Sequence, residues 1–261
     1  MDPFDSPKFL VRQTQASVAE LKTMLDAIFA TNPKRRIVEV DPQTGNKTFK
    51  IVFGGVIPDK VRHIAATAIT DLRHALDQAF CAAVVTLTNA DPASLYFPIS
   101  RNKADLQGRL TKSGMPSEMH PIFLGFQSYP TENVTDGGND ALCALAKAAQ
   151  GKHRISCQVR GSITTMHIGS VSASYVISQS VPPVWDSVKN EIVLAVTKPA
   201  GHFNGDFVVT FDVTLSNAGP LTGYDAVPTL HGLSGMVESI VLGIEAEAVR
   251  LLKDRSSPNP A

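Results

Sequence analysis

Hydrophobic side chains recur every three to four positions in three long stretches of the chain, the spacing of one buried face of an α-helix. The first stretch starts at Ser6-Pro7, an N-cap followed by a proline, and stops before Asn32-Pro33. The second runs from Pro58 to about residue 88, and the third from about Thr229 to Leu252. The middle stretch has the longest apolar stripe: Val61, Ile64, Ala65, Ala68, Ile69, Leu72, Leu76, Phe80, Ala83, Val84 and Leu87.

Three shorter helices are expected between the second and third long ones. Two of them cover Lys103–Leu110 and Glu118–Phe126. Asn139 or Asp140 caps the third, which ends at Gly151, a residue type that favours helix C-termini.

Alternation of apolar and polar residues predicts strands in two regions. Segments 37–40 and 48–53 flank a turn-rich loop and predict a β-hairpin. After Arg154 the chain becomes rich in Ser, Thr and Val, and further strands are expected over 156–167, 172–177, 191–197 and 207–215. In the last of these, Phe207, Val209, Phe211, Val213 and Leu215 share one face.

These elements predict an α+β fold. Residues 1–155 are expected to form a mainly helical part that includes the hairpin (about 36–53). Residues 156–255 are expected to form an antiparallel sheet covered by the final long helix, and residues 256–261 a disordered tail. The two parts are also compatible with one cooperative domain, because 261 residues suit one large domain or two small ones.

Composition excludes several classes of protein. The chain has 24 basic and 24 acidic residues and only 18 % charged residues, so it does not resemble a strongly basic nucleic-acid binder. Residues 1–155 carry 18 basic and 15 acidic side chains, and residues 156–261 carry 6 and 9, giving +3 and −3. Three cysteines without a C-x-x-C pair, and no recognisable signal peptide or membrane span, predict reduced thiols in the cytoplasm and no membrane partner.

Standard catalytic and cofactor motifs are missing from the sequence. There is no Gly-rich phosphate loop, no G-x-S-x-G segment and no H-E-x-x-H. The seven histidines are scattered, with no pair at i, i+4 on a predicted helix. We therefore expect no cofactor and no metal.

The segment Leu72–Gln78 contains the main candidate site. Arg73 and Asp77 lie one helical turn apart at the border of the apolar stripe, so both side chains are expected to be partly buried at a helix–helix seam. A guanidinium there needs carboxylate or carbonyl partners. The favoured interpretation is a structural ion pair, and the alternative is an anion clamp in a site that binds or cleaves a phosphodiester.

Lys152-His153-Arg154 forms a second cationic feature at the end of the helix that starts near Asn139. Cations at this end complement the helix dipole, which is the favoured explanation. The flanking charges also lower the pKa of a histidine, which suits a neutral base. If this helix end lies against Arg73 and Asp77, the residues form one polar cluster.

The order of these motifs, with L-R-x-x-L-D at 72–77, Phe97-Pro98-Ile99 and Lys152-His153-Arg154, resembles a family of uncharacterised bacterial proteins. The L-R-x-x-L-D-H form of that motif also resembles the HEPN superfamily. That resemblance implies a metal-independent endoribonuclease that pairs two sites across a homodimer and acts on RNA. Gln78 stands where the histidine would be, and glutamine cannot exchange a proton. Such a site would be inactive or would use His153.

Three functional hypotheses follow. The first is a soluble, non-catalytic interaction or accessory module in which Arg73, Asp77 and His153 are mainly structural. The second is the HEPN-like ribonuclease, with Arg73, Asp77, His153 and Arg154 as its candidate catalytic residues. The third is a small-molecule binder that uses a cavity between helices and sheet.

Overall fold

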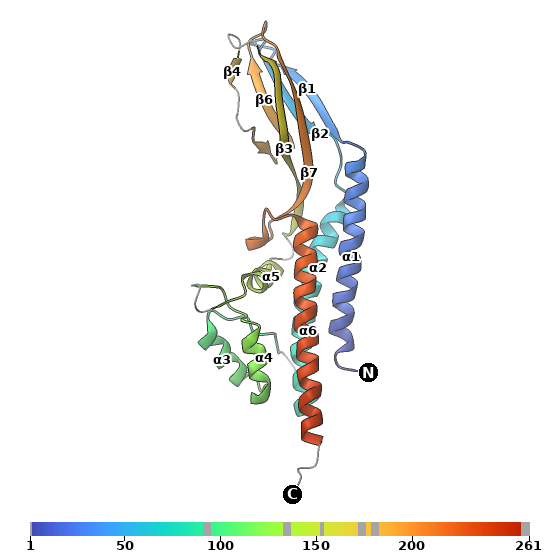
Figure 1. Cartoon of the computed structure of the whole chain (residues 1–261), viewed down its shortest axis with the longest axis vertical. Coiled ribbons are helices and arrows are strands. Elements are labelled where there is room, and N and C mark those ends of the chain that lie inside the picture. Colours follow the sequence, from blue (N-terminus) through green and yellow to red (C-terminus); the bar gives the residue numbers. More distant parts are fainter. Residues whose placement is uncertain are drawn as a thin grey trace. The chain divides into compact units, whose positions relative to one another are not determined.

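The structure is a computed structural model, which describes residues 2–90, 95–132, 137–151, 154–171, 176–178 and 183–256. The chain forms two compact units. The helical unit comprises 1–21, 62–156 and 215–261, and the sheet unit comprises 22–61 and 157–214. The predicted mixture of helices, a hairpin, antiparallel sheets and a final long helix is confirmed (Figure 1).

The predicted helices are present with small shifts at their ends. Their bounds are α1 (Asp5–Ala30), α2 (Asp59–Thr88), α3 (Lys103–Lys112), η1 (Ser117–Met119), α4 (His120–Gly125), α5 (Asp140–Gln150), η3 (Gly219–Leu221) and α6 (Ala226–Ser256). The segment expected as one helix over 118–126 is divided into η1 and α4. Pro121 lies in the first turn of α4, where its missing N–H costs no helical hydrogen bond.

Polar contacts join α1 to α2 and α6 in the helical unit, where these three helices lie side by side (Figure 1). Lys8 Nζ on α1 lies 2.6 Å from Glu245 Oε1 on α6, and Gln15 Nε2 donates to Glu238 Oε2 at 2.8 Å. The hydrogen bond from Lys8 to Glu245, together with the negative charge of Glu245, raises the pKa of the Lys8 ammonium above its ordinary value. Ten residues of α6 are buried, and the helix also contacts α4 and α5.

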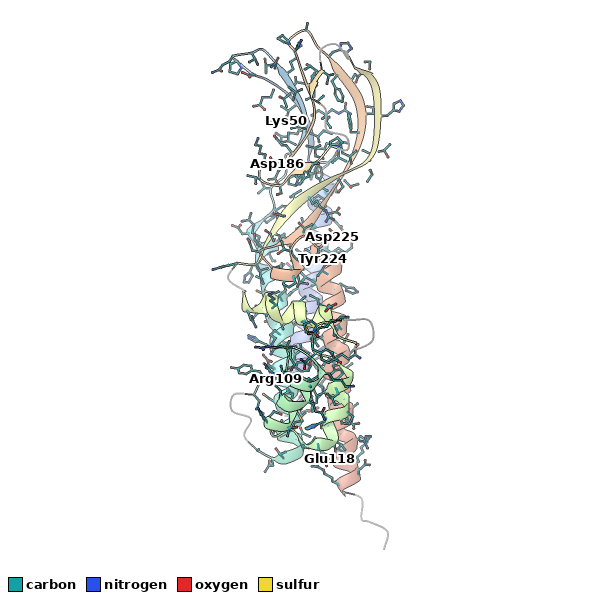
Figure 2. The ribbon with its side chains drawn as sticks, turned by 90° about the vertical axis from the view of Figure 1, so that its left-hand side faces the viewer. Lys50, Arg109, Glu118, Asp186, Tyr224 and Asp225 are labelled. Carbon is teal, nitrogen blue, oxygen red and sulfur yellow. The ribbon has the colours of Figure 1, made fainter. Side chains whose placement is uncertain are left out.

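The main sheet has the strand order β1-β2-β6-β4, and β5 also pairs with β6. The strands are β1 (Lys34–Val40), β2 (Lys47–Phe53), β4 (Val176–Ser178), β5 (Trp185–Asp186) and β6 (Glu191–Thr197). All of these pairs are antiparallel. On β2, Lys50 (labelled in Figure 2) binds Glu39 of β1 and Glu191 of β6, each at 2.7 Å, so one partly buried lysine joins three strands.

A second, two-stranded sheet pairs β3 (Ser156–Val171) with β7 (Phe203–Ser216). Threonine hydroxyls bind carbonyls across this pair: Thr164 to Val208, Thr210 to Ser162, and Thr214 to Gln158. The residue numbers on β3 fall as those of their partners on β7 rise, so the two strands are antiparallel. The predicted alternation on β7 holds in the first part of the strand, where Phe207 is buried and Val208 is exposed. It ends near residue 213, because Thr214, predicted on the polar face, is buried together with Val213 and Leu215.

The core of the sheet unit contains Ile51, Ile192, Leu194 and Phe207, and Trp185 packs against it. Trp185 also lies directly on the backbone of Gly161, and its indole Nε1 donates to the carbonyl of Val159 at 2.9 Å. A Cβ atom added at Gly161 would be 2.5 Å from the indole ring, so this position requires glycine.

The compact units group the elements differently from the predicted division at residues 155 and 156. The predicted hairpin belongs to the sheet unit, because β2 pairs along its free edge with β6, more than 130 residues later in the chain. The last helix, expected to cover the sheet, belongs to the helical unit. The predicted disordered tail over 256–261 lies outside the described residues except for Ser256, the last residue of α6.

By length and composition, α6 could span a membrane, with a mean hydropathy of 1.3 over its most apolar window. In that window 39 % of the residues are buried within the protein. A core helix of a soluble protein has the same composition, so α6 is weak evidence for a membrane. The predicted cytoplasmic location stays a prediction.

Candidate functional site

Arg73 and Asp77 form the ion pair that the sequence predicts. Arg73 Nη2 lies 2.8 Å from Asp77 Oδ1, and the two side chains are only 18 % and 16 % exposed. Both come from α2, one turn apart, so the helix itself sets their spacing.

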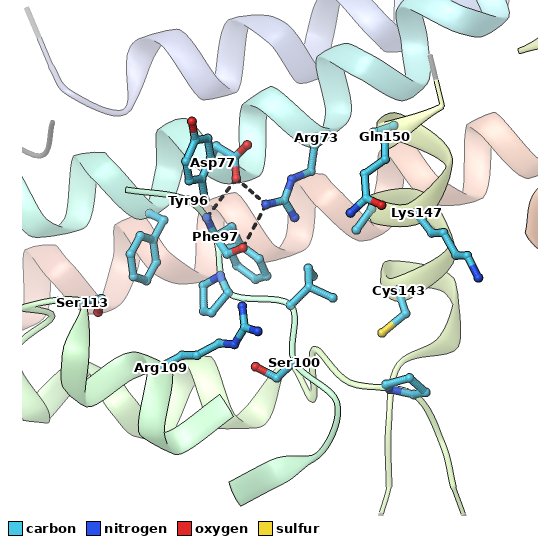
Figure 3. Close-up of a pocket in the computed structure, with 16 residues that line it drawn as sticks. Arg73, Asp77, Tyr96, Phe97, Ser100, Arg109, Ser113, Cys143, Lys147 and Gln150 are labelled. Carbon is cyan, nitrogen blue, oxygen red and sulfur yellow. Dashed lines mark hydrogen bonds and ion pairs between the residues drawn. The ribbon is translucent and has the colours of Figure 1, made fainter. Parts of the chain in front are cut away.

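The pair binds a loop rather than a second helix, which corrects the expected helix–helix seam. Arg73 Nη2 donates to the carbonyl of Phe97 at 3.0 Å, and the N–H of Phe97 donates to Asp77 Oδ1 at 2.9 Å (Figure 3). The loop at 95–102 has no regular secondary structure, so its backbone polar groups need partners from elsewhere. The ion pair supplies two of them.

Burial has the largest effect on the carboxyl of Asp77 and raises its pKa above the ordinary value. The charge of Arg73 and the N–H of Phe97 act in the opposite direction, and so does His74. Burial therefore destabilises the charged carboxylate by more than Arg73, the N–H of Phe97 and His74 together stabilise it.

Further contacts hold the same loop in place. The ring of Phe97 is buried within 6.5 Å of the ring centroids of Phe80, Phe123 and Phe126. Ser128 Oγ donates to the carbonyl of Pro98 at 2.6 Å, and the N–H of Ser100 donates to the carbonyl of Ser128 at 2.8 Å. Four backbone groups between 97 and 100 are therefore fixed.

A cavity of about 830 Å³ lies beside this loop, wholly within the helical unit (Figure 3). We call it the Arg73 cavity. Its walls come from α2, the loop at 96–100, α3 and α5. The lining residues are Arg73, Asp77, Phe80, Tyr96, Phe97, Pro98, Ile99, Ser100, Arg109, Ser113, Pro130, Cys143, Ala146, Lys147, Ala149 and Gln150.

Two polar atoms of the cavity residues are buried without a hydrogen-bond partner: Arg73 Nη1 and Ser100 Oγ. Ser100 is only 6 % exposed. An unpaired buried polar group costs about 1–3 kcal/mol, so native proteins keep few of them without a reason.

Arg109 and Lys147 add two exposed cationic side chains to the cavity lining. Arg109 Nε lies 3.4 Å from Asp105, which is its neighbour on α3. Among the described lining residues, Asp77 is the sole acidic one, and three are basic: Arg73, Arg109 and Lys147. The lining is positive although the whole chain has no net charge.

Cys143 on α5 also lines the cavity. Burial and the nearby Asp140 raise the pKa of its thiol to about 11. The thiolate is the reactive form, so Cys143 is a poor nucleophile at neutral pH.

The structure does not bring all predicted site residues together. His153 lies outside the described residues. Arg154 is exposed, donates its backbone N–H to Gly151, and is not among the residues that line the cavity. Gln78 accepts a hydrogen bond at 2.8 Å from Ser6 of α1 and does not line the cavity either.

Ser100, Arg109 and Lys147 were not predicted as site residues. Each lies in a separate segment, and none belongs to a spaced motif. Arg109 and Lys147 also occupy ordinary exposed positions on amphipathic helices, where cations are expected. The one sequence signal was Phe97-Pro98, which marks a loop anchored by an aromatic ring.

No group of three or more His, Cys, Asp or Glu side chains that could hold a metal ion occurs among the described residues. In comparisons with protein-family models, with curated proteins and with solved structures, nothing matches this chain.

Proposed function

We propose that this protein binds a small molecule in the Arg73 cavity. The observation that supports the proposal is a cavity of about 830 Å³ lined mainly by apolar side chains, into which a few polar groups converge. Ligand sites in proteins have this composition and volumes of about 300–1,000 Å³. The small-molecule hypothesis from the sequence placed the cavity between helices and sheet, whereas all of its lining residues belong to the helical unit.

The rigidity of the loop at 97–100 also supports binding. Its backbone is held by Arg73, Asp77 and Ser128, so a ligand meets a wall that is already ordered. Binding to a preformed wall avoids much of the entropy cost of ordering a flexible one.

Filling the cavity tests this proposal. Ala149 lines the cavity and is partly exposed, so Ala149→Trp inserts an indole there with little disturbance of the core. Ala141→Trp makes the same change at an exposed position of α5 outside the cavity. A small-molecule library is screened by ligand-observed NMR against the wild type and both variants. We expect hits that bind the wild type and Ala141→Trp but not Ala149→Trp.

The proposal is wrong if no compound binds, or if Ala149→Trp keeps every hit while remaining folded by circular dichroism. The accessory-module and ribonuclease hypotheses stay predictions, because His153 is not described. The ribonuclease hypothesis predicts loss of RNA in the presence of EDTA that His153→Ala abolishes.

A further inference from the structure

The outer edge of β1 has no partner strand in the part of the chain that the structure describes. β1 is the first strand in the order β1-β2-β6-β4, and it pairs with β2 alone among the described strands (Figure 1). Six of its seven residues are exposed. The backbone N–H and C=O groups along a free edge can pair with a further strand, which extends the sheet.

The register of the hairpin identifies the residues that present these groups. Opposite residues in an antiparallel pair alternate between hydrogen-bonded and non-hydrogen-bonded pairs. Just before β1, the carbonyl of Pro33 accepts from the N–H of Gly54 at 2.6 Å. Just after β1, the N–H of Asp41 donates to the carbonyl of Asn46 at 2.9 Å. Both pairs continue the unbroken register of β1 with β2, so the backbone groups of odd-numbered residues face β2. The outward groups belong to Lys34, Arg36, Val38 and Val40.

β1 lacks most of the features that block free edges. Natural proteins protect such edges with prolines, with bulges or with charged side chains along the strand. β1 contains no proline, and no register shift interrupts its pairing with β2. Its basic residues occupy its first three positions, whereas the apolar residues Ile37, Val38 and Val40 are all exposed. The second half of β1 is therefore open to another strand.

The charges of β1 match a second copy of the same strand. Antiparallel pairing through the two outer edges places even-numbered residues opposite even-numbered ones. When Ile37 lies opposite Ile37 of the second copy, Arg35 lies opposite Glu39 in both halves of the interface. Opposite charges directly across an antiparallel pair stabilise it, and like charges destabilise it. This register also pairs all seven residues of each strand.

The neighbouring registers match less well. A register centred on Arg36 places two guanidinium groups directly opposite each other. A register centred on Val38 pairs only residues 36–40 of each β1 and leaves Arg35 outside the paired segment. The arrangement centred on Ile37 is therefore favoured.

Arg35 and Glu39 are available for these contacts. Both residues are exposed, and alternation along the strand places them on one face together with Ile37. Glu39 binds Lys50 through Oε2, so its Oε1 is left for a second cation. A carboxylate has enough acceptor sites to bind both cations at once.

We propose that two copies of this protein associate through β1, antiparallel and with Ile37 at the two-fold axis, so that their main sheets form one continuous sheet. Arg35 of each copy pairs with Glu39 of the other. The interface is isologous, as in most homodimers. This inference concerns the sheet unit and does not rest on the proposed function.

Blocking the edge tests the pairing. Dimerisation of the full chain is measured by sedimentation velocity from about 1 to about 300 µM, the range expected of a small interface. Val38→Pro removes an outward N–H that β2 does not use, and it should weaken the dimer at least about tenfold. Val38→Thr keeps both this N–H and a β-branched side chain, and it should change the dissociation constant by less than about threefold. Circular dichroism melting curves show whether both variants are folded.

Exchanging charges tests the register. Arg35→Glu and Glu39→Arg each place like charges opposite each other, so each variant should dimerise at least about tenfold more weakly than the wild type. Lys50 keeps its ion pair with Glu191 in Glu39→Arg. An equimolar mixture of the two variants restores opposite charges at both positions of a heterodimer and should associate about as tightly as the wild type. Asp26→Arg makes the same change of charge as Glu39→Arg at an exposed position of α1, and should dimerise as the wild type does.

Other results would overturn the inference. A wild type that stays monomeric over this concentration range leaves the edge of β1 to a strand of another protein. Dimers that persist in folded Val38→Pro form through a different surface. A mixture of Arg35→Glu and Glu39→Arg that associates no more tightly than either variant alone excludes the register centred on Ile37. None of these results changes the test of the Arg73 cavity, which uses ligand binding.

Discussion

Arg73 and Asp77 together bind both backbone polar groups of Phe97: Arg73 donates to its carbonyl, and Asp77 accepts from its N–H. One turn of α2 thereby holds the loop at 95–102, which forms a wall of the cavity. The ion pair therefore anchors this loop and shapes the proposed binding site, while the structural role and the anion-clamp role both stay predictions.

Removing the carboxylate of Asp77 should destabilise the protein. Asp77→Ala leaves Arg73 and the N–H of Phe97 without their partner, and we expect a loss of about 2–4 kcal/mol in the free energy of unfolding. Urea denaturation followed by circular dichroism measures it. Asp26→Ala is the control, since its i, i+4 pair with Lys22 is more than 60 % exposed and should contribute less than about 0.5 kcal/mol. Equal losses of unfolding free energy in the two variants would contradict the role of Asp77 in holding Arg73 and the N–H of Phe97.

The raised pKa of Asp77 predicts a pH dependence that Asp77→Asn abolishes. Between the unfolded value near 3.8 and the higher folded pKa, the folded protein holds a proton that the unfolded chain has released. The contribution of this carboxyl to stability therefore falls as pH rises through that interval, and it is constant above the folded pKa. We expect the unfolding free energy of the wild type minus that of Asp77→Asn to decrease from pH 3.8 upward. A difference that increases with pH would show that the native pKa is lowered instead.

The close contact of Trp185 with Gly161 predicts that a glycine-to-alanine substitution destabilises the protein at Gly161. The same substitution at Gly108, which has no close neighbour, should stabilise it. Gly161→Ala brings a methyl group to 2.5 Å from the indole and should destabilise the sheet unit by about 1–3 kcal/mol. Gly108→Ala on α3 meets nothing within 4 Å and should stabilise its helix by about 0.5–1 kcal/mol. Trp185 is the single tryptophan of the chain, so fluorescence reports on the contact directly. Unchanged fluorescence and stability in Gly161→Ala would contradict this packing.

Cys143 offers a chemical probe of the cavity. With a thiol pKa of about 11, its alkylation by iodoacetamide at pH 8 should be on the order of 100-fold slower than that of an unperturbed cysteine. The rate should rise tenfold per pH unit up to about pH 11, provided that the protein stays folded. Peptide mass spectrometry separates Cys143 from Cys81 and Cys157. Rapid alkylation at pH 8 would show that the thiol is not desolvated as described.

The sequence by itself determined the local elements. Helical periodicity located α2 and α6 within a few residues, and alternation identified one face of β7, because these patterns reflect repeats of 3.6 and 2 residues in the chain itself. The spacing of Arg73 and Asp77 on one helix was enough to predict their ion pair.

Only the tertiary structure decided how the elements combine. The partner of β2 is β6, and the partner of the Arg73–Asp77 pair is the backbone of Phe97; neither is encoded by a local period. The candidate site depends most on these distant contacts. Ser100, Arg109 and Lys147 come from a loop and two helices, and only the packing of α2, α3 and α5 places them around one cavity with Arg73. A pattern with a fixed spacing along the chain cannot report such a convergence, because the residues share a site only after the backbone has folded.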